Sequence, residues 1–349
     1  MQTQARDTAA FYRSWAQVEA RGSSPQYQAL AEAVADDPTT IAFLDALPRS
    51  KRQPNLLFGA LRWFGAPVED PAAALAQLRQ QTAEVAALMR ARATQTNEAA
   101  RCAVMLPALG LVGGPLALLE LGASAGLCLL PDRWCYAWTD EHGRTTRLGD
   151  ASDPGAVLLE ASVRGNPPLP DRHPEIAARL GLDAHPVQAG DPDERRWLRC
   201  LVWPEHTERA TRLAAALEMA ARARVDIRAG SFPDDIAETV AALRTAAPGA
   251  PVVVTHSAAA AYLDQDGRHR FASELDALDV HRIGLEGLAV SRDLGVAGLE
   301  DVDVREMAHR FVLSLDGQAL GTAHPHGRDL DWWSPGAPGP EPAGAAGKV

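Results

Sequence analysis

The segment Leu116-Ala-Leu-Leu-Glu-Leu-Gly-Ala-Ser-Ala-Gly126 decides how this chain is expected to fold. Its first six residues form a short apolar run bounded by glycines, which is typical of a strand buried on both faces of a sheet. Gly122 permits a turn that a Cβ atom would crowd, and Gly126 permits close packing of the following helix on the strand. A strand, a glycine-rich turn and a helix in succession predict a Rossmann-like α/β domain.

The acidic residue before the turn indicates which kind of ligand this domain binds. Glu120-x-Gly122-x-x-x-Gly126 resembles the acidic-x-Gly-x-Gly-x-Gly pattern of class I S-adenosylmethionine-dependent methyltransferases, with Ser124 at the middle glycine. A carboxylate at position 120 suits the ammonium group of a methionine moiety, and amide groups at the helix start can bond a polar ligand. We therefore expect Glu120, Gly122, Ala123, Ser124 and Gly126 to bind S-adenosylmethionine.

The rest of the chain predicts a helical region, an α/β domain and a tail. Apolar residues recur at helical spacing from Arg6 to about Leu111, which predicts an all-helical N-terminal region over residues 1–112. Residues 113–333 are expected to form a mostly parallel, doubly wound sheet domain, with a cap of about residues 141–224 inserted between its second and third strands. The Pro/Gly/Ala-rich residues 334–349 are expected to be disordered.

Later strands are expected where short apolar runs alternate with helical segments. Residues 311–315 and 318–323 predict a hairpin around the turn residues Asp316 and Gly317. The other expected strands are Trp134–Trp138, Val225–Arg228, Pro251–Thr255 and His281–Glu286. The polar, proline-rich stretch from about Asp140 to Asp193 predicts no strand.

Polar residues at expected strand ends are further candidates for the site. Asp140 lies twenty residues after Glu120, at the end of the second expected strand, where an acid can chelate a ribose diol. His256 and Ser257 follow an apolar strand, and His256 is a candidate general base. The alternatives are a solvated turn acid for Asp140 and locally satisfied hydrogen bonds for His256. Asn97 is expected either to reach the methionine end of the cofactor or to cap a helix.

The expected cap contains a second group of candidates. Trp203, Glu205, His206 and Arg209 lie in this insertion, where they can select the substrate. The structural alternative is a helix start, because Pro204 suits a first turn and Glu205 favours the positive end of a helix dipole.

The turn Gly122-Ala-Ser-Ala-Gly126 also spells the GxSxG nucleophile elbow of α/β-hydrolases. A serine hydrolase using Ser124 would need a later aspartate and histidine. The candidates are Asp301, Asp303, Asp316, His324 and His326. The order of elements opposes this reading, because a hydrolase elbow follows several strands and the segment upstream is helical.

Composition limits the partners and the cellular setting. A formal net charge of -11 argues against sequence-independent binding to nucleic acid. The four cysteines have no CxxC spacing and are expected to be buried free thiols, and two histidines in His324-Pro-His326 are too few for a metal site. There is no signal-peptide pattern and no apolar run that could span a membrane, so we expect a cytoplasmic protein.

Five segments together resemble an uncharacterised bacterial family, domain of unknown function 2332. They are Thr94–Glu98, Leu118–Leu127, Arg196–Glu205, Val254–Ser257 and His324–Gly327. The resemblance implies a methyltransferase-like fold but no established substrate. The chain departs from the family pattern at Cys128, where Asn is expected, and at Ser231, where an acid would contact the adenine amine. Ser231 is therefore an expected cofactor contact unless Asp234 or Asp235 replaces it.

These observations lead to one expected function and two alternatives. The expected function is a methyltransferase that uses S-adenosylmethionine and acts on a small-molecule acceptor. The first alternative is a non-catalytic protein that binds a ligand or a partner on the same fold. The second is the serine hydrolase.

Overall fold

The computed structural model describes residues 7–153, 155–304, 307 and 309–333, and the chain divides into two compact units. The helical unit takes the residues up to Asn97 together with Asp191–Ala214. The sheet unit takes Glu98–Gly190 together with the residues from Ala215 onward. This boundary differs from the expected one near residue 112, because α7 (Arg101–Val112) contacts strands of the sheet. The expected disordered tail, residues 334–349, lies outside the described residues.

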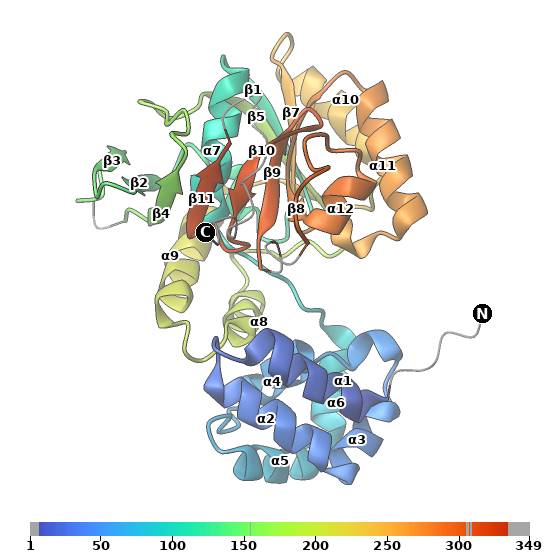
Figure 1. Cartoon of the computed structure of the whole chain (residues 1–349). Helices are drawn as coiled ribbons and strands as arrows, with labels where there is room; N and C mark the ends of the chain where they lie inside the picture. The colour runs from blue at the N-terminus through green and yellow to red at the C-terminus, as the bar shows by residue number, and fades with distance from the viewer. Residues whose placement is uncertain (1–6, 154, 305–306, 308, 334–349) are drawn as a thin grey trace, which may run out of the picture. The chain divides into compact units, whose positions relative to one another are not determined.

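The expected helices of the N-terminal region are confirmed, and Figure 1 shows them in blue and cyan. Ser24, Asp37 and Asp70 each accept a backbone N–H at a helix start, and each precedes a proline in the first turn. The helices of this unit are α1 (Thr8–Trp15), α2 (Pro25–Asp36), α3 (Pro38–Asp45), α4 (Pro54–Trp63), α5 (Pro71–Gln80), α6 (Thr82–Ala91), α8 (Pro192–Leu201) and the first part of α9 (Thr207–Ala223).

This unit has its own core. The buried side chains include Tyr12, Tyr27, Phe58 and Trp197, and the last of these comes from α8, about a hundred residues after the preceding helix of the unit. None of the helices in the described ranges is long and apolar enough to cross a membrane.

In the described part of the sheet unit, eleven strands form one sheet in the order β3-β2-β4-β11-β10-β9-β8-β7-β1-β5-β6. The five strands from β6 to β8 run parallel, as do β2, β4 and β11, whereas β3, β9 and β10 pair antiparallel. The expectation of an α/β protein with a mostly parallel sheet is therefore confirmed. The strands are β1 (Leu116–Leu121), β2 (Cys135–Asp140), β3 (Thr145–Leu148), β4 (Leu158–Arg164), β5 (Ile176–Asp183), β6 (Ile227–Ala229), β7 (Val252–Ser257), β8 (His281–Gly287), β9 (Phe311–Leu315), β10 (Gln318–Ala323) and β11 (Asp329–Trp332).

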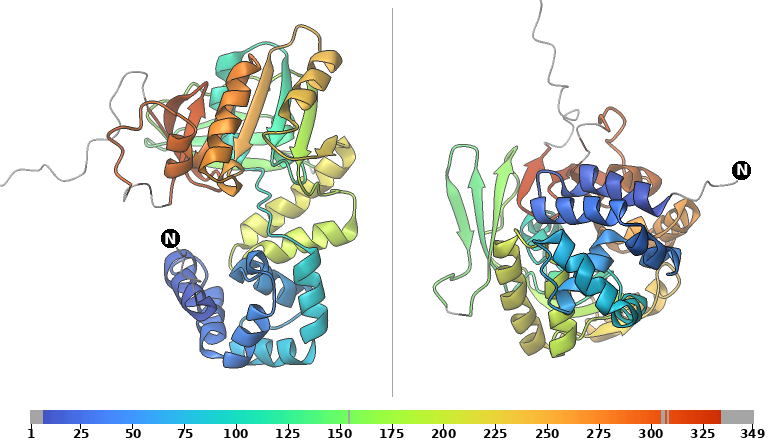
Figure 2. Two further views of the ribbon diagram at one scale, coloured as in Figure 1. Left: turned by 90° about the vertical axis from the view of Figure 1, so that its right-hand side faces the viewer. Right: turned by 90° about the horizontal axis from the view of Figure 1, so that it is seen from below.

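The predicted hairpin of β9 and β10 is confirmed. Asp316 and Gly317 both have positive φ, 48° and 75°, as the tight turn between two antiparallel strands requires. The sequence did not predict β11, which pairs with β10 and with β4 and so joins β2, β3 and β4 to the rest of the sheet. These last three strands form the green extension at one side of the sheet in Figure 2.

The helices that pack on one face of the sheet show which residues of β1 point to that face. Alternate β1 residues, Leu119 and Leu121, share a buried cluster with α10 (Ile236–Ala246), α11 (Gln265–Ala277) and α12 (Leu288–Asp293). Because successive side chains of a strand point to opposite faces, Glu120 faces away from this cluster.

The first half of the sheet differs from expectation. The second expected strand is present as β2, which begins at Cys135, but it pairs with β3 and β4, whereas the neighbours of β1 are β5 and β7. The expectation that residues 141–224 form a separate cap is wrong, because this range contains β3, β4 and β5 of the sheet. Prolines mark the loops of this stretch, and the strands lie between them. The helix expected after Gly126 is also absent, because a single 3-10 turn, η3 (Leu127–Leu129), follows instead.

Candidate functional site

Buried charged residues gather where β1, β5, β7 and β8 end at their carboxyl edge. This is the edge at which open parallel sheets bind ligands. Glu120 lies one residue before the end of β1, Asp183 ends β5, and Glu286 lies one residue before the end of β8. Arg101 is the first residue of α7, and its side chain bonds Ser257 at the end of β7. All four side chains are at most 9% exposed.

Arg101 and Glu120 are buried groups of opposite charge type, and the carboxyl of Glu120 is incompletely hydrogen-bonded. The Arg101 Nε donates to the carbonyl of Pro325 (2.9 Å), and its Nη1 donates to the carbonyl and Oγ of Ser257 (3.1 and 3.0 Å). Within the described residues, Oε2 of Glu120 is buried and makes no hydrogen bond. Burial and the nearby Cys128 thiol raise the pKa of the Glu120 carboxyl well above its usual value, although Arg101 lowers it.

The amide groups of the glycine-rich turn bond to the protein itself. Gly122 and Ala123 donate to the carbonyl of Leu182 (2.8 and 3.4 Å). The amide of Ser124 donates to Oδ2 of Asp183 (2.8 Å). The expectation that free amides at a helix start would hold the ligand is therefore wrong, since these amides are used and no α-helix follows the turn.

Close packing requires both glycines of the turn. A Cβ atom on Gly122 would lie 2.9 Å from the Cβ of Ala259, and one on Gly126 would lie 3.2 Å from Val225 and Ile227. Both glycines also have positive φ, 73° and 71°. The turn is thus covered by the loop after β7, and ligand contacts here must come from side chains around it.

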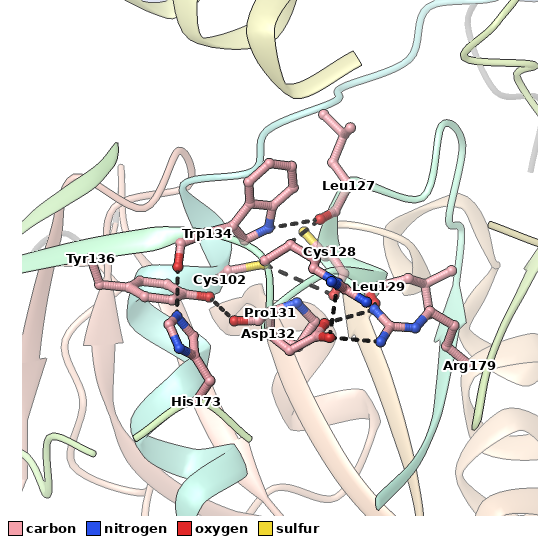
Figure 3. A network of polar contacts seen from close by, with 11 residues as sticks. Cys102, Leu127, Cys128, Leu129, Pro131, Asp132, Trp134, Tyr136, His173 and Arg179 are labelled. Carbon is pink, nitrogen blue, oxygen red and sulfur yellow. Dashed lines mark hydrogen bonds and ion pairs between the residues drawn. The ribbon is translucent and has the colours of Figure 1, made fainter. Parts of the chain in front are cut away.

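A polar network replaces the expected helix after the turn (Figure 3). Arg179 of β5 donates to both carboxylate oxygens of Asp132 (2.7 and 2.8 Å) and to the carbonyl of Leu129 (2.8 Å). The indole of Trp134 donates to the carbonyl of Leu127 (3.1 Å). These bonds fix the segment from residue 127 to 134 on β5, in a conformation that is not helical.

Asp183, and not Asp140, is the acid at the end of the strand beside the glycine-rich turn. Because β5 adjoins β1, the acid at the end of β5 lies beside the turn, where Oδ1 accepts from the amide of His185 (2.7 Å). Asp140 ends β2 on the far part of the sheet and pairs with Arg144 in an exposed turn (2.7 Å). The placement of Asp140 next to the cofactor turn is wrong, and its contacts match the alternative of a turn acid.

His256 is buried and held by one carboxylate. Its Nδ1 lies 2.9 Å from Oε1 of Glu286, and its ring packs edge-on against Phe271 of α11. The ring therefore lies on the face opposite to Glu120. These contacts match the alternative of a histidine satisfied locally. Ser257, one residue later, points the other way and bonds Arg101.

The candidates for the adenine end lie at the edge strand β6. The amide of Ser231 donates to Oδ2 of Asp235 (2.8 Å), and Asp234 pairs with Arg270 (2.6 Å) in solvent. Both acids considered as replacements for Ser231 thus have partners within the protein.

The substrate candidates of the expected cap belong to the helical unit, as does the buried Asn97. Glu205 accepts from the Ser24 hydroxyl (2.5 Å) and the Gln26 amide (3.0 Å), and so holds the start of α2. Burial alone would raise the pKa of the Glu205 carboxyl, but these bonds lower it.

Trp203 and His206 also have partners inside this unit. The Trp203 indole donates to Asn55 (2.9 Å), and the His206 ring stacks on Trp203 and lies 3.1 Å from the Ser23 hydroxyl. Arg209 follows on α9. The structural alternative placed Pro204 and Glu205 in the first turn of a helix, but α9 begins only at Thr207, and Glu205 instead bonds the start of α2.

The components of a hydrolase triad are engaged elsewhere. Asp316 pairs with His281 (2.8 Å) at the amino end of β8, away from the glycine turn. The Nδ1 of His324 accepts from the amide of His326 (3.0 Å), so it does not donate to a carboxylate. Burial first, and then the neighbouring Arg328, lower the pKa of His324 to about 4.

The sequence did not point to Arg101, Asp183, Glu286 or Tyr262. Asp183 carried a signal, because the segment Ile176–Asp183 ends in an acid and the first expected strand carries Glu120 one residue before its end. The other three carried none, since an arginine at a helix start and a glutamate in an apolar strand acquire meaning only from their neighbours in space.

The last candidates are the cysteines and the side chains that could bind a metal ion. All four cysteines are free and buried, as predicted. In the part of the chain that the structure describes, no three His, Cys, Asp or Glu side chains form a group that could hold a metal ion.

Comparison with known proteins places the chain in a family. No curated protein and no solved structure matches it. A family model described as "Uncharacterized protein conserved in bacteria (DUF2332)" matches residues 9–332, which is nearly the whole chain and both units. The chain therefore belongs to this bacterial family.

Proposed function

We propose that the protein is a methyltransferase that binds S-adenosylmethionine at the carboxyl edge of β1, β5 and β7 and acts on a small-molecule acceptor. The strand order supports this proposal. Numbered along the chain among themselves, the five parallel strands β6, β5, β1, β7 and β8 have the order 3-2-1-4-5, which is the order of a Rossmann-like, doubly wound sheet. In such a sheet the crevice beside the first strand is the usual ligand site.

The incompletely hydrogen-bonded Glu120 carries the proposal, together with Arg101 beside it. A buried ion that lacks part of its hydrogen bonding is costly unless a partner compensates it. The methionine end of S-adenosylmethionine is a zwitterion, so its ammonium group would compensate Glu120 and its carboxylate would pair with the guanidinium of Arg101. One amino-acid moiety thus fits both groups.

Asp183 fits the ribose of the same ligand. A carboxylate at the end of the strand next to β1 is the group that accepts from a ribose diol in doubly wound folds. Each Asp183 oxygen already accepts one amide, from Ser124 or His185, and keeps a second lone pair for a hydroxyl.

The chain's contribution to catalysis would be binding and orientation. Bound S-adenosylmethionine supplies an electrophilic methyl group on a sulfonium. Arg101, Glu120 and Asp183 would fix the two ends of the cofactor, and the covered turn would keep water from one side. Holding two reactants in line accounts for much of the barrier reduction in a direct displacement, and no protein nucleophile is needed.

A second candidate is a binding protein that does not catalyse transfer. The observation that favours it is the position of His256, the base expected from the sequence, which Glu286 holds on the face away from Glu120. A ligand bound at this edge would then have no base among the groups predicted for it.

Calorimetry separates these functions. We expect S-adenosylmethionine and S-adenosylhomocysteine to bind the full chain and NAD not to bind. Glu120→Gln and Arg101→Met should each weaken binding by about tenfold or more, the usual scale of a lost charge-assisted hydrogen bond. Glu160→Gln, at an exposed position of β4, is the matched control and should bind as the wild type does.

The outcomes distinguish three cases. Absence of binding of both sulfur compounds, or wild-type affinity of Glu120→Gln, contradicts the proposed site. Binding without transfer of labelled methyl groups to any fraction of small metabolites favours the binding protein. Labelling of Ser124 by a fluorophosphonate probe would instead favour the hydrolase.

A further inference from the structure

Tyr262 is an exposed aromatic side chain in the loop that follows β7. Among the described residues, the large apolar side chains that are exposed are Val18, Leu111, Tyr262 and Val304, so Tyr262 is the aromatic one. Its exposed fraction is 76%. It ends the 3-10 turn η4 (Ala260–Tyr262), which follows β7, and its amide donates to the carbonyl of Ala259 (3.2 Å).

Two sets of contacts fix η4 at the carboxyl edge. Oε1 of Glu286 accepts from the amides of Ala259 and Ala260, both at 3.0 Å. The Cβ of Ala259 packs against Gly122 so closely that a Cβ there would lie 2.9 Å away. Tyr262 is thus held beside the glycine-rich turn by a bonded and packed segment.

The charged groups around this edge are mostly negative. Glu120, Asp183 and Glu286 are buried carboxyl groups, and Arg101 is the guanidinium among them. Asp183 belongs to the same contact network, because it bonds the amide of Ser124 in the turn that Ala259 covers.

The environment of the Tyr262 hydroxyl agrees with this arrangement. The surrounding protein raises its pKa despite the exposed ring, Arg101 lowers it, and both Asp183 and Glu286 raise it. An aromatic face amid carboxylates attracts a cation, because the ring quadrupole and the carboxylates act in the same direction.

We propose that Tyr262 binds the positively charged onium group of a ligand against the face of its ring. The charge is either the sulfonium of the cofactor or an ammonium group of the methyl acceptor. The assignment of the ligand rests on the proposed function, whereas the cation-binding role of Tyr262 rests on the contacts of η4 and the charges around it.

The first experiment compares S-adenosylmethionine with S-adenosylhomocysteine, which lacks the charge. Calorimetry uses the full chain as wild type, Tyr262→Phe and Tyr262→Leu. If the sulfonium is the ligand, we expect the wild type and Tyr262→Phe to bind the charged compound about two- to fivefold tighter, on the scale of an exposed cation–π contact. Tyr262→Leu should lose this preference and keep its affinity for S-adenosylhomocysteine. Because the side chain is exposed, circular dichroism should show that both variants are folded like the wild type.

The second experiment tests the ammonium. The chain, with and without saturating S-adenosylhomocysteine, is titrated with choline and with its uncharged carbon analogue, in which a tert-butyl group replaces trimethylammonium. A preference for choline over the uncharged analogue would assign the site to an ammonium group, provided that Tyr262→Leu abolishes this preference and Tyr262→Phe retains it.

Failure of the inference and failure of the proposed function have different signatures. If the charged and neutral ligands bind equally in both experiments, or if Tyr262→Leu preserves a charge preference, the inference is overturned whatever the cofactor. If neither sulfur compound binds but choline binds in a Tyr262-dependent way, the inference stands and the methyltransferase proposal fails.

Discussion

The carboxyl group of Glu120 is buried, and its protonation state affects both stability and binding. Burial and the Cys128 thiol raise its pKa in the folded protein well above the ordinary value of 4.5. Between these two values the folded state binds more protons than the unfolded state. The contribution of Glu120 to stability is therefore fully present below pH ~4.5 and is lost as the pH rises through the folded-state pKa.

Replacing Glu120 with glutamine should remove the decrease in stability that the wild type shows as the pH rises. Glu120→Gln keeps the shape and stays neutral, so we expect it to be more stable than the wild type at pH 8 and closer to it at pH 5. Denaturant unfolding at both pH values measures the difference. A difference that does not change with pH would contradict the assignment of a raised pKa to this residue.

The same titration should appear in ligand binding. An ammonium group pairs with the ionised form of Glu120, so the affinity for S-adenosylhomocysteine should fall as the pH is lowered through the raised pKa. Calorimetry of the wild type and Glu120→Gln at several pH values tests this. The variant should bind weakly at every pH, and a retained pH dependence in the variant would assign the titration to another group.

At the scale of elements, the turn after β1 is restricted by packing as well as by its backbone. Gly122 has a φ of 73°, and a Cβ there would meet Ala259 at 2.9 Å. Gly114 has a similar φ, 70°, and has nothing within 4 Å of a Cβ. Comparing alanine variants at Gly122 and Gly114 therefore separates the cost of the left-handed backbone from the cost of the steric contact.

We expect Gly114→Ala to cost about 1–2 kcal/mol through the left-handed backbone alone. Gly122→Ala should cost roughly 1–3 kcal/mol more, because a methyl group is forced into a packed contact. Chemical denaturation of both variants measures the costs. Equal costs would show that Ala259 moves away freely and that the loop after β7 is not held against the turn.

The loop after β7 depends on a single carboxylate oxygen. Oε1 of Glu286 accepts from His256 and from the amides of Ala259 and Ala260. Glu286→Leu leaves these donors buried without an acceptor, and we expect a loss of about 2–4 kcal/mol in stability. The exposed Glu238→Leu on α10 is the control and should change stability by less than about 0.5 kcal/mol. Thermal unfolding of both variants measures these changes. A loss at Glu286 no larger than at the control would show that Glu286 does not stabilise the loop after β7.

At the scale of the whole molecule, the helical unit is built from two separate parts of the sequence. Its core includes Trp197 and Cys200 of α8, which lie in Asp191–Ala214, between strands of the sheet unit. Removal of the residues up to Asn97 would leave these apolar side chains without their core.

Truncation tests this organisation. We expect residues 98–349 to aggregate when expressed alone. Solubility should return when Asp191–Ala214 is also replaced by a flexible Gly/Ser linker. Size-exclusion chromatography and dye binding to exposed apolar surface compare the two forms. If the first truncation alone is soluble and folded, α8 does not depend on the N-terminal helices.

Features that have local causes could be predicted from the residues alone. The run from Leu116 to Gly126 predicted a buried strand and a tight turn, Asp316-Gly317 predicted the hairpin, and helical spacing predicted the first unit. Each depends on residues within one or two turns of chain, where apolar periodicity and the conformational freedom of glycine are sufficient evidence.

Which segments are neighbours depends on how the whole chain packs, and no local pattern shows it. Packing placed β5 and not β2 beside β1, so that Asp183 and not Asp140 reaches the turn, and it brought Arg101 next to Glu120 and η4 over Gly122. Periodicity reveals that a strand is buried but not which strand it pairs with. In a parallel sheet, adjacent strands are joined by long crossovers, here the fifty-four residues between Leu121 and Ile176. The partners in the site are therefore chosen by packing of distant segments, for which no local pattern exists.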